Sequence, residues 1–181
     1  MVAKLQAEYN VDVDWRPYYL RPDTPPEGLE LSEHIKRARA NGSEERLSQM
    51  AQMHGMKFRS TERIYNTRLA HEATEYARQK GKGFEFHHVV FEKFYGHGED
   101  ISKWDVLRDT ALQVGLDAEE MQREVEAGKY TATVNALVKE ASQIGVTGVP
   151  TYVLNDRYAI VGAQPYEAFL QALEQIKKKQ K

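Results

Sequence analysis

The stretch that decides the fold lies near the C-terminus and reads Gly145-Val146-Thr147-Gly148-Val149-Pro150-Thr151-Tyr152-Val153-Leu154. A helix is expected to end at Gly145, and a β-branched run begins directly at Pro150. Proline is tolerated at the first residue of a strand because the ladder has not yet begun there. An X-Pro bond in such a turn is also the usual place for a cis peptide. We therefore predict a helix, a turn with a cis Val149–Pro150 bond and a strand, although the bare spacing equally allows a trans proline.

The residues after this stretch predict a hairpin and a last helix. Asn155-Asp156 is a two-residue turn of the kind that tolerates positive φ, and a second strand follows from Arg157 to Val161. Gly162-Ala163-Gln164 then leads through Pro165 into the final helix.

The N-terminal part predicts a helix followed by a strand. Met1 to Tyr9 has the pattern of an amphipathic helix that lacks a starting cap. Val11 to Trp15 alternates apolar and polar residues, which is the period of a half-exposed strand, and the chain continues extended to Leu20. Pro17 favours an edge position for that strand. Pro22 to Gly28 is interpreted as a linker.

From about Leu29 to Gly145 the pattern is helical throughout. Glycine stops and polar starts divide this block into seven helices. We expect Ser32 to cap the first helix, and Asp117 with Glu120 to form an acidic capping box for the sixth. The first five predicted helices lie near 32–41, 43–55, 67–79, 84–95 and 102–115. The sixth begins at 117, and the seventh ends at 145.

The composition excludes several classes of function. The 181 residues include 25 Lys and Arg and 27 Asp and Glu, with a net charge of −2, so no electrostatic footprint for nucleic acid or an anionic membrane is present. No apolar run approaches the ~18 residues of a membrane span, and no signal-peptide pattern follows Met1. We therefore expect a cytoplasmic protein with no nucleic-acid or membrane partner.

The chain contains no cysteine. Disulfides, thiolate metal sites and a cysteine nucleophile are therefore excluded in this polypeptide. His87 and His88 are adjacent on a predicted helix and point in different directions, and no carboxylate stands beside them at zinc-ligand spacing. We interpret them and His97 as ordinary surface or half-buried residues, and predict no metal site.

Five patches, in order along the chain, carry a family resemblance. They are Trp15 to Leu20 with Arg21-Pro22-Asp23, Asn66-Thr67 with Ala70-His71, Phe91 to Ile101, Gly115-Leu116-Asp117, and Gly145 to Pro150 with Gly162-Ala163-Gln164-Pro165. Together they resemble the DsbA-like thioredoxin family, most closely its FrnE-like members. The resemblance implies an α/β, thioredoxin-like fold with an inserted all-helical subdomain. It places residues 1–27 and 140–181 in the thioredoxin-like domain and 28–139 in the helical insertion.

The resemblance also implies a function. Family members are thiol–disulfide oxidoreductases that carry Cys-x-x-Cys at the start of their first helix, after a first strand. This chain resembles a family member that lacks this segment, that is, an N-terminally truncated or mis-started form. We therefore expect it to be redox-inactive and to have no catalytic residue. Two alternatives stay open: a thiol-independent protein that binds peptides or small molecules, and a relative of the glutathione-dependent branch of kappa-class transferases and hydroxychromene-carboxylate isomerases.

Candidate binding residues follow from the resemblance. Val149, before Pro150, is expected to pair its backbone with an extended peptide or a small thiol compound; otherwise Pro150 only shapes the loop. Gly162, Ala163 and Gln164 precede a helix N-terminus, where a ligand carboxylate fits, and glutathione is the one cofactor kept open. Asn66 and His71 belong to a shared motif, with a helix-packing hydrogen bond as the alternative role for His71.

The implied loss of the first strand leads to one architectural expectation. In the thioredoxin fold that strand lies between the strand at Val11 and the strand at Thr151. We expect the Val11 strand to close directly onto Thr151–Leu154, or a second chain to donate a strand and form a homodimer. The remaining alternative is a chain that is only marginally folded.

Overall fold

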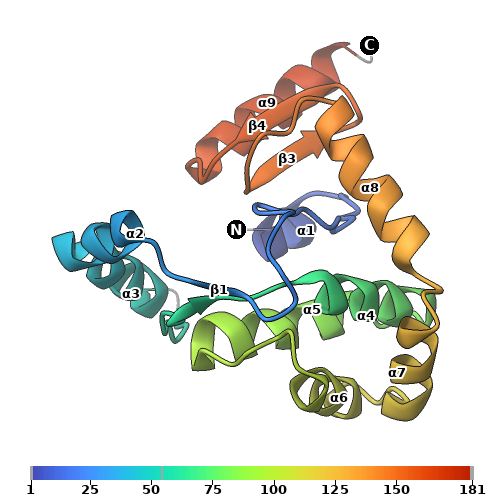
Figure 1. Ribbon diagram of the computed structural model, residues 1–181. Coiled ribbons are helices and arrows are strands. Elements are labelled where there is room, and N and C mark those ends of the chain that lie inside the picture. The colour runs from blue at the N-terminus through green and yellow to red at the C-terminus, as the bar shows by residue number, and fades with distance from the viewer. Residues whose placement is uncertain (1, 54, 180–181) are drawn as a thin grey trace. The chain divides into compact units, whose positions relative to one another are not determined.

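The described residues, 2–53 and 55–179, divide into two units in the computed structural model (Figure 1). The hairpin unit contains the chain up to Leu20 and again from Leu137 onward, and the helical unit runs from Arg21 to Ala136. The sequence predicted these boundaries at 27/28 and 139/140. In the structure the first boundary follows Leu20, so the proline-rich linker belongs to the helical unit. Each unit is described by itself.

The helical unit holds most of the regular structure. Its elements are β1 (Leu29–Glu30), α2 (Glu33–Ala38), η1 (Arg39–Ser43), α3 (Glu44–Met53), β2 (Arg63–Ile64), α4 (Arg68–Gln79), α5 (Gly83–Phe91), η2 (Glu92–His97), α6 (Trp104–Gln113), α7 (Ala118–Glu126) and the first part of α8 (Thr131–Gln143), up to Ala136. The insertion is therefore not entirely helical, because β1 and β2 pair as a short antiparallel sheet with Leu29 opposite Ile64. The hydrophobic pattern did not predict these strands because each has only two residues.

Two predicted helix caps are present. The Ser32 hydroxyl accepts the Ile35 N–H, and the Asp117 carboxylate accepts the N–H groups of Glu119 and Glu120 at 3.0 and 2.9 Å. The predicted capping box is only half formed. The Glu120 carboxylate turns away from the helix start and accepts bonds from the Tyr76 hydroxyl at 2.7 Å and the Lys80 ammonium at 2.8 Å.

One hydrophobic core lies inside the helical unit, between α4, α5, α6 and α7. Tyr76 and Tyr130 meet edge-to-face at its centre, with ring centroids 6.1 Å apart. The small side chains of the buried alanines on α4 allow the neighbouring helices to approach closely. The buried members are Ala70, Ala73, Tyr76, Ala77, Phe86, Val90, Ile101, Leu107, Ala111, Ala118, Met121, Val125 and Tyr130.

The hairpin unit contains α1 (Val2–Glu8), β3 (Thr151–Leu154), β4 (Tyr158–Val161), α9 (Tyr166–Lys179) and the end of α8. Leu5 of α1 and Phe169 and Ile176 of α9 are its buried hydrophobic residues within the described part of the chain. The two helices are tied together at the surface, where the Tyr166 hydroxyl donates to Glu8 at 2.7 Å. The Lys4 ammonium lies 4.3 Å from the Tyr166 ring centroid and adds a cation–π contact.

The hairpin forms largely as predicted. Asn155 and Asp156 have φ of 50° and 53°, and the Arg157 N–H donates to the Leu154 carbonyl across the turn. The register pairs Leu154 with Tyr158, so the loop between the strands has three residues, 155–157, and not the two that were predicted.

The prediction of a strand from Val11 to Trp15 is wrong. Residues 10–19 form no strand, and the sheet of this unit contains β3 and β4 alone among the described residues. The expected closure of this segment onto Thr151–Leu154 is therefore wrong as well. Arg16 holds the segment instead, with its guanidinium 2.9 Å from Asp14 and 2.7 Å from Glu140 on α8.

No helix in the described residues has both the length and the apolar character needed to cross a bilayer.

Candidate functional site

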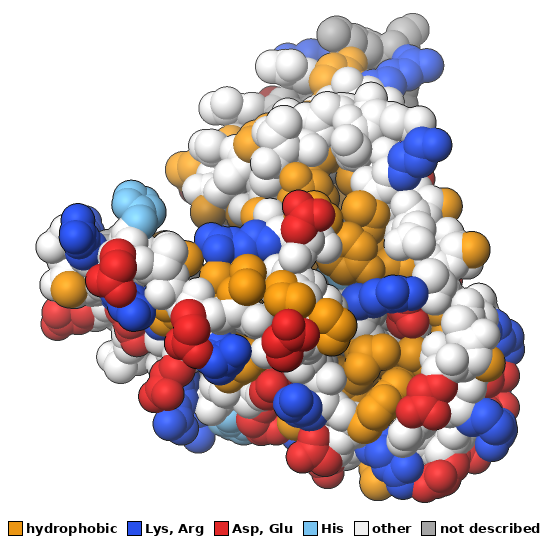
Figure 2. Space-filling view, viewed as in Figure 1, with side chains coloured by type: hydrophobic (Ala, Val, Ile, Leu, Met, Phe, Trp, Pro, Cys, Tyr) orange, Lys and Arg blue, Asp and Glu red, His pale blue; other side chains and the backbone are white. Residues whose placement is uncertain are grey.

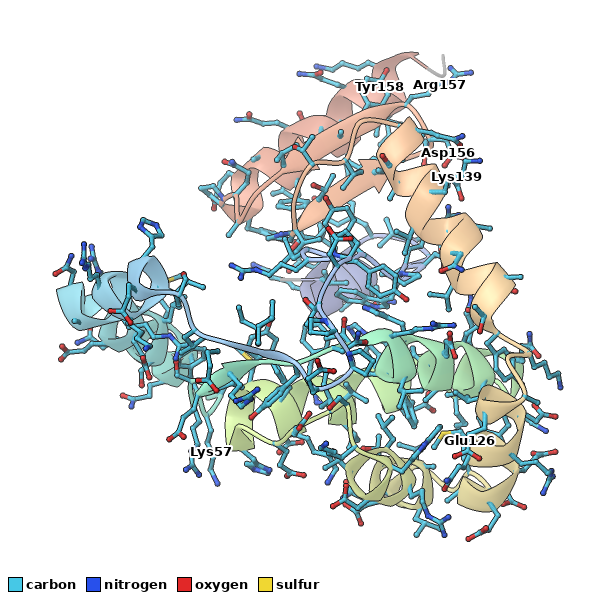
Figure 3. The ribbon with its side chains drawn as sticks, viewed as in Figure 1. Lys57, Glu126, Lys139, Asp156, Arg157 and Tyr158 are labelled. Atoms are coloured by element: carbon cyan, nitrogen blue, oxygen red, sulfur yellow. The ribbon has the colours of Figure 1, made fainter. Side chains whose placement is uncertain are left out.

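The β3–β4 hairpin brings together two of the predicted binding segments. The Gly162 N–H donates to the Pro150 carbonyl at 2.8 Å, so the loop before β3 and the loop after β4 lie at the same end of the hairpin. Figure 3 shows Asp156, Arg157 and Tyr158 at the opposite, turn end. The charges of the hairpin are thus at its turn, and residues 144–154 contain none.

Val149 is an exposed predicted contact in the first loop. Its residue surface is 50% exposed, and its backbone N–H and C=O form no hydrogen bond with any described residue. The Val149–Pro150 peptide bond is cis. The Thr151 hydroxyl donates to the Gly148 carbonyl at 2.7 Å and closes the loop on its other side.

The register decides which residues of β3 remain available. In an antiparallel ladder alternate residues exchange both backbone bonds with the same neighbour. Because Pro150 and Gly162 form a hydrogen-bonded pair, Tyr152 and Leu154 also bond to β4. Thr151 and Val153 therefore direct their N–H and C=O groups to the other edge, where the sheet has no further strand among the described residues.

The side chains on the two faces of the hairpin differ. Tyr152 packs edge-to-face on Phe169 of α9 at 4.8 Å between centroids, and burial raises the pKa of its phenol. Val153 and Val161 point to the opposite face and are 41% and 60% exposed. On the face drawn in Figure 2, hydrophobic side chains gather around β3. The open edge is thus uncharged and bordered by valines.

The loop after β4 has a structural role in this conformation. The Gln164 side-chain amide donates to the Val161 carbonyl at 3.0 Å, and its backbone N–H donates to the Gly162 carbonyl. Gly162 has φ of 81°, a conformation that glycine adopts at little cost. Gln164 therefore covers part of the outer edge of β4, while the edge of β3 stays open.

Asn66 and His71 lie in the helical unit. The Asn66 amide donates to the Thr24 carbonyl at 2.6 Å, and its oxygen accepts the Arg68 N–H at the start of α4. His71 is partly buried on α4; desolvation, together with the charge of His87, lowers its pKa to about 4. Asn66 thus anchors the linker to α4, and the His71 imidazole is neutral at physiological pH.

The histidine and carboxylate side chains do not form a metal-binding cluster in the described part of the chain. No three His, Asp or Glu side chains gather there into a set that could hold an ion. The ring centroids of His87 and Phe91 lie 4.3 Å apart and those of Phe84 and His88 6.5 Å apart, so both histidines pack against aromatic neighbours along α5.

The comparisons with known proteins agree with this fold. The family model described as "DSBA-like thioredoxin domain" matches residues 1–174. The uncharacterized protein YwbO of Bacillus subtilis (strain 168) is 28% identical over 173 residues, covering 94% of this chain and 84% of that protein. The crystal structure of a probable DsbA oxidoreductase from Streptomyces coelicolor aligns with a TM-score of 0.81 at 27% identity, covering 88% of this chain and 73% of that one.

A second solved structure, a 2-hydroxychromene-2-carboxylate isomerase, aligns over 99% of this chain and 88% of its own length, with a TM-score of 0.78. At 18% identity it shows a shared fold only. The hairpin, its proline loop and the helical insertion define a thioredoxin-like protein. Because the family model covers nearly the whole sequence, this chain belongs to the DSBA-like thioredoxin domain family. The predicted family and fold class are confirmed, and the narrower FrnE-like assignment stays a prediction.

Thr151 and Val153 are not among the contact residues predicted from the sequence. Alternation along the predicted strand could have found them as a pair, but which edge they face depends on the register with β4.

Proposed function

We propose that this polypeptide binds extended polypeptide segments by main-chain pairing along the open edge of β3, and performs no thiol chemistry itself. The second half of the proposal rests on composition. Disulfide exchange requires a thiolate to attack a disulfide, and the chain has no cysteine. Membership of a family that includes a probable DsbA oxidoreductase supports a polypeptide as the binding partner.

The observation that carries the proposal is a set of backbone groups, at Val149, Thr151 and Val153, that no described residue pairs with along the edge of β3. A row of free N–H and C=O groups on a sheet edge is a template for another strand. Strand addition uses these groups for affinity and the alternate side chains for specificity.

The chemistry of the edge indicates which peptides suit it. Val149 and Val153 are 50% and 41% exposed, and no charged residue occurs from Ile144 to Leu154. A peptide with β-branched or aromatic residues at alternate positions would cover these valines, since such cross-strand pairs are the favourable ones. A strongly charged peptide would gain nothing from this surface.

Glutathione receives less support. Between Ile144 and Pro165 the one cation is Arg157, at the turn end of the hairpin. The Gln164 amide, the polar side chain of the second loop, already donates to Val161. A ligand carboxylate at the loop after β4 would therefore lack a charged partner from this segment.

Proline substitution tests the proposal directly. Val153→Pro removes one edge N–H of β3, and Val161→Pro makes the same change on the outer edge of β4; proline is tolerated where the N–H faces outward. Titration of a seven-residue Thr/Val/Tyr peptide, followed by amide NMR shifts, should show binding to the wild type and the Val161→Pro variant. The Val153→Pro variant should bind about tenfold more weakly, because the hydrogen bond donated by the N–H of residue 153 is lost.

Equal binding by both proline variants, or shift changes confined to the helical unit, would contradict the proposal. The redox half is tested separately by insulin reduction with dithiothreitol as electron donor. We expect no rate above that of dithiothreitol alone, and a catalysed rate would show that the chemistry has been misassigned.

A further inference from the structure

The sulfur chemistry of this chain is confined to methionine, because the sequence holds five methionines and no cysteine. Met50 and Met53 belong to α3, Met56 follows that helix, and Met121 belongs to α7. The first three are 51%, 75% and 58% exposed, whereas Met121 is 0% exposed in the helical core. Within the described residues, accessible thioether sulfur is therefore gathered at one short surface segment.

The exposure of these methionines follows from the way α3 is built. Leu47, Met50 and Met53 recur every three residues and form an apolar stripe, the α3 stripe. None of the ten residues of α3 is buried, and its close packing among the described elements is with η1, which leads into it. No element of the helical unit covers the α3 stripe, so small solutes reach it in the folded state.

The end of α3 fixes the place of Met56. Gly55 has φ of 70°, and its N–H donates to the Gln52 carbonyl at 3.0 Å. The Met56 N–H donates to the Ala51 carbonyl at 2.9 Å, which completes a Schellman motif. The third exposed thioether is thus held close to the end of the helix by backbone hydrogen bonds.

Exposed thioethers react with hydroperoxides by transfer of an oxygen atom. A sulfur lone pair attacks the outer peroxide oxygen, so that an S–O bond forms and the O–O bond breaks. The proton on the transferred oxygen passes to the other oxygen, which leaves as water or an alcohol. The sulfur loses two electrons and the peroxide gains them. No ionised group is needed, so access to the sulfur decides which methionine reacts.

We propose that Met50, Met53 and Met56 form a reversible oxidation site that accepts oxygen atoms from hydroperoxides, and that Met121 is protected in the folded chain. Each sulfoxide is polar, so oxidation converts the apolar α3 stripe into a polar surface. Methionine sulfoxide reductases remove the oxygen again, with one enzyme class for each sulfoxide epimer. This site lies in the helical unit and does not depend on the proposed function of the β3 edge.

The fold explains why oxidation is tolerated at this site. The three exposed side chains are not part of the core, so a sulfoxide there stays in contact with water. A sulfoxide at Met121 would bury a polar oxygen among apolar neighbours, which costs free energy unless it is hydrogen-bonded. A helix of ten residues with no buried face is also marginally stable, so α3 opens locally and admits a reductase to the modified side chain.

The first test is oxidation of the full, folded chain by hydrogen peroxide, followed by mass spectrometry of its peptides. Met50, Met53 and Met56 should each gain one oxygen about tenfold faster than Met121, because susceptibility follows exposure. In urea all four rates should become similar, since the protection of Met121 depends on folding. Equal rates for Met121 and the other three in the folded chain would overturn the proposal, and so would slow oxidation of all four.

The second test measures whether oxidation changes the surface and spares the core. The oxidised wild type should keep its urea midpoint by circular dichroism and lose fluorescence of a bound apolar dye. Treatment with both reductases and dithiothreitol should restore the dye signal. The matched control combines Met50→Leu, Met53→Leu and Met56→Leu, which keeps the apolar surface and removes the thioethers.

The dye signal of this triple variant should not respond to peroxide. A response equal to that of the wild type would contradict the assignment of the three methionines. A lowered urea midpoint in the oxidised wild type alone, or oxygen that the reductases fail to remove, would overturn the proposal of a reversible surface site.

Discussion

The two units of this chain differ sharply in how they are held together. The helical unit buries Tyr76, Tyr130, Phe86, Leu107 and Met121 to less than 2% exposure around a single core. The hairpin unit has three buried hydrophobic residues within the described chain, Leu5, Phe169 and Ile176, and one open strand edge. Proteins place binding segments in their less stable parts because such parts can still rearrange. The helical unit is thus the better-packed part of the chain, and the hairpin unit carries the proposed binding edge.

Each unit contains one tryptophan, which allows the comparison to be measured. Trp15 lies in the hairpin unit, and Trp104 lies in the helical unit, where it packs against the core. Variants that keep a single tryptophan report the unfolding of one unit at a time.

The largest effect is expected from Phe86→Ala. Phe86 is fully buried on α5, so its removal should cost about 3–5 kcal/mol of unfolding free energy, reported by Trp104 in urea. Phe84, on the same helix, is 53% exposed, and Phe84→Ala should change the value by less than about 0.5 kcal/mol. Similar losses in the two variants would show that the helical core is not the stabilising element.

Glu72→Ala should have the next largest effect. The Glu72 carboxylate is 4% exposed and accepts bonds from Arg68 and from the Thr131 hydroxyl, each at 2.9 Å. Removing it leaves the Thr131 hydroxyl without this acceptor, and we expect a loss of about 2–3 kcal/mol in the same assay. Glu119→Ala is the control. The Glu119 side chain is 72% exposed and pairs with Arg108, so its removal should lower the unfolding free energy by less than about 1 kcal/mol. Equal costs would contradict the burial of Glu72.

Acidification should weaken the helical unit through His71. Its pKa is about 4 in the folded chain, chiefly because of desolvation, against 6.5 in an unfolded chain. Between these values the unfolded state binds more protons, so stability should fall as the pH falls from about 6.5 to about 4. We expect His71 to account for about 3 kcal/mol of that loss. The His71→Gln variant should lose this part of the dependence, whereas His97→Gln, at an exposed site, should keep it; an unchanged profile in His71→Gln would contradict the assignment.

The smallest effect is expected in the hairpin turn. Asp156 has φ of 53°, which costs a non-glycine residue some stability. Asp156→Gly should stabilise the hairpin unit by about 0.5–1 kcal/mol, reported by Trp15, and leave the Trp104 signal unchanged. Gly162→Ala, at φ of 81°, is the converse control and should destabilise the same unit. A response from Trp104 to either change would mean that the units do not unfold separately.

The helices were predictable because their signals are local. Ser32 and Asp117 cap the helices they precede, and Gly145 follows the end of α8, since caps depend on residues a few positions away. The prediction of a strand at Val11 was wrong because a strand depends on a distant partner and not on local signals. Alternation describes a segment that could join a sheet, but a strand exists only where a partner offers its backbone, and the described residues offer none there.

The proposed binding edge includes some of the predicted contact residues and omits others. The Gly145 to Pro150 motif led to Val149 and Pro150, and the structure joins this loop to Gly162 through a backbone bond. Gln164 was predicted as a ligand contact, but its amide is engaged with Val161 in this conformation. Local sequence does not reveal whether a polar side chain faces a ligand or its own backbone.

The sequence by itself determined the family, the hairpin with its turn, the order of the helices and the absence of a thiol. These properties depend on composition and on residues close together in the chain. Only the tertiary structure decided that Thr151 and Val153 face an open edge, that the α3 stripe is uncovered, and that desolvation holds His71 neutral. The physical reason is that edge pairing, burial and desolvation depend on atoms brought together from distant parts of the chain, which no local pattern encodes.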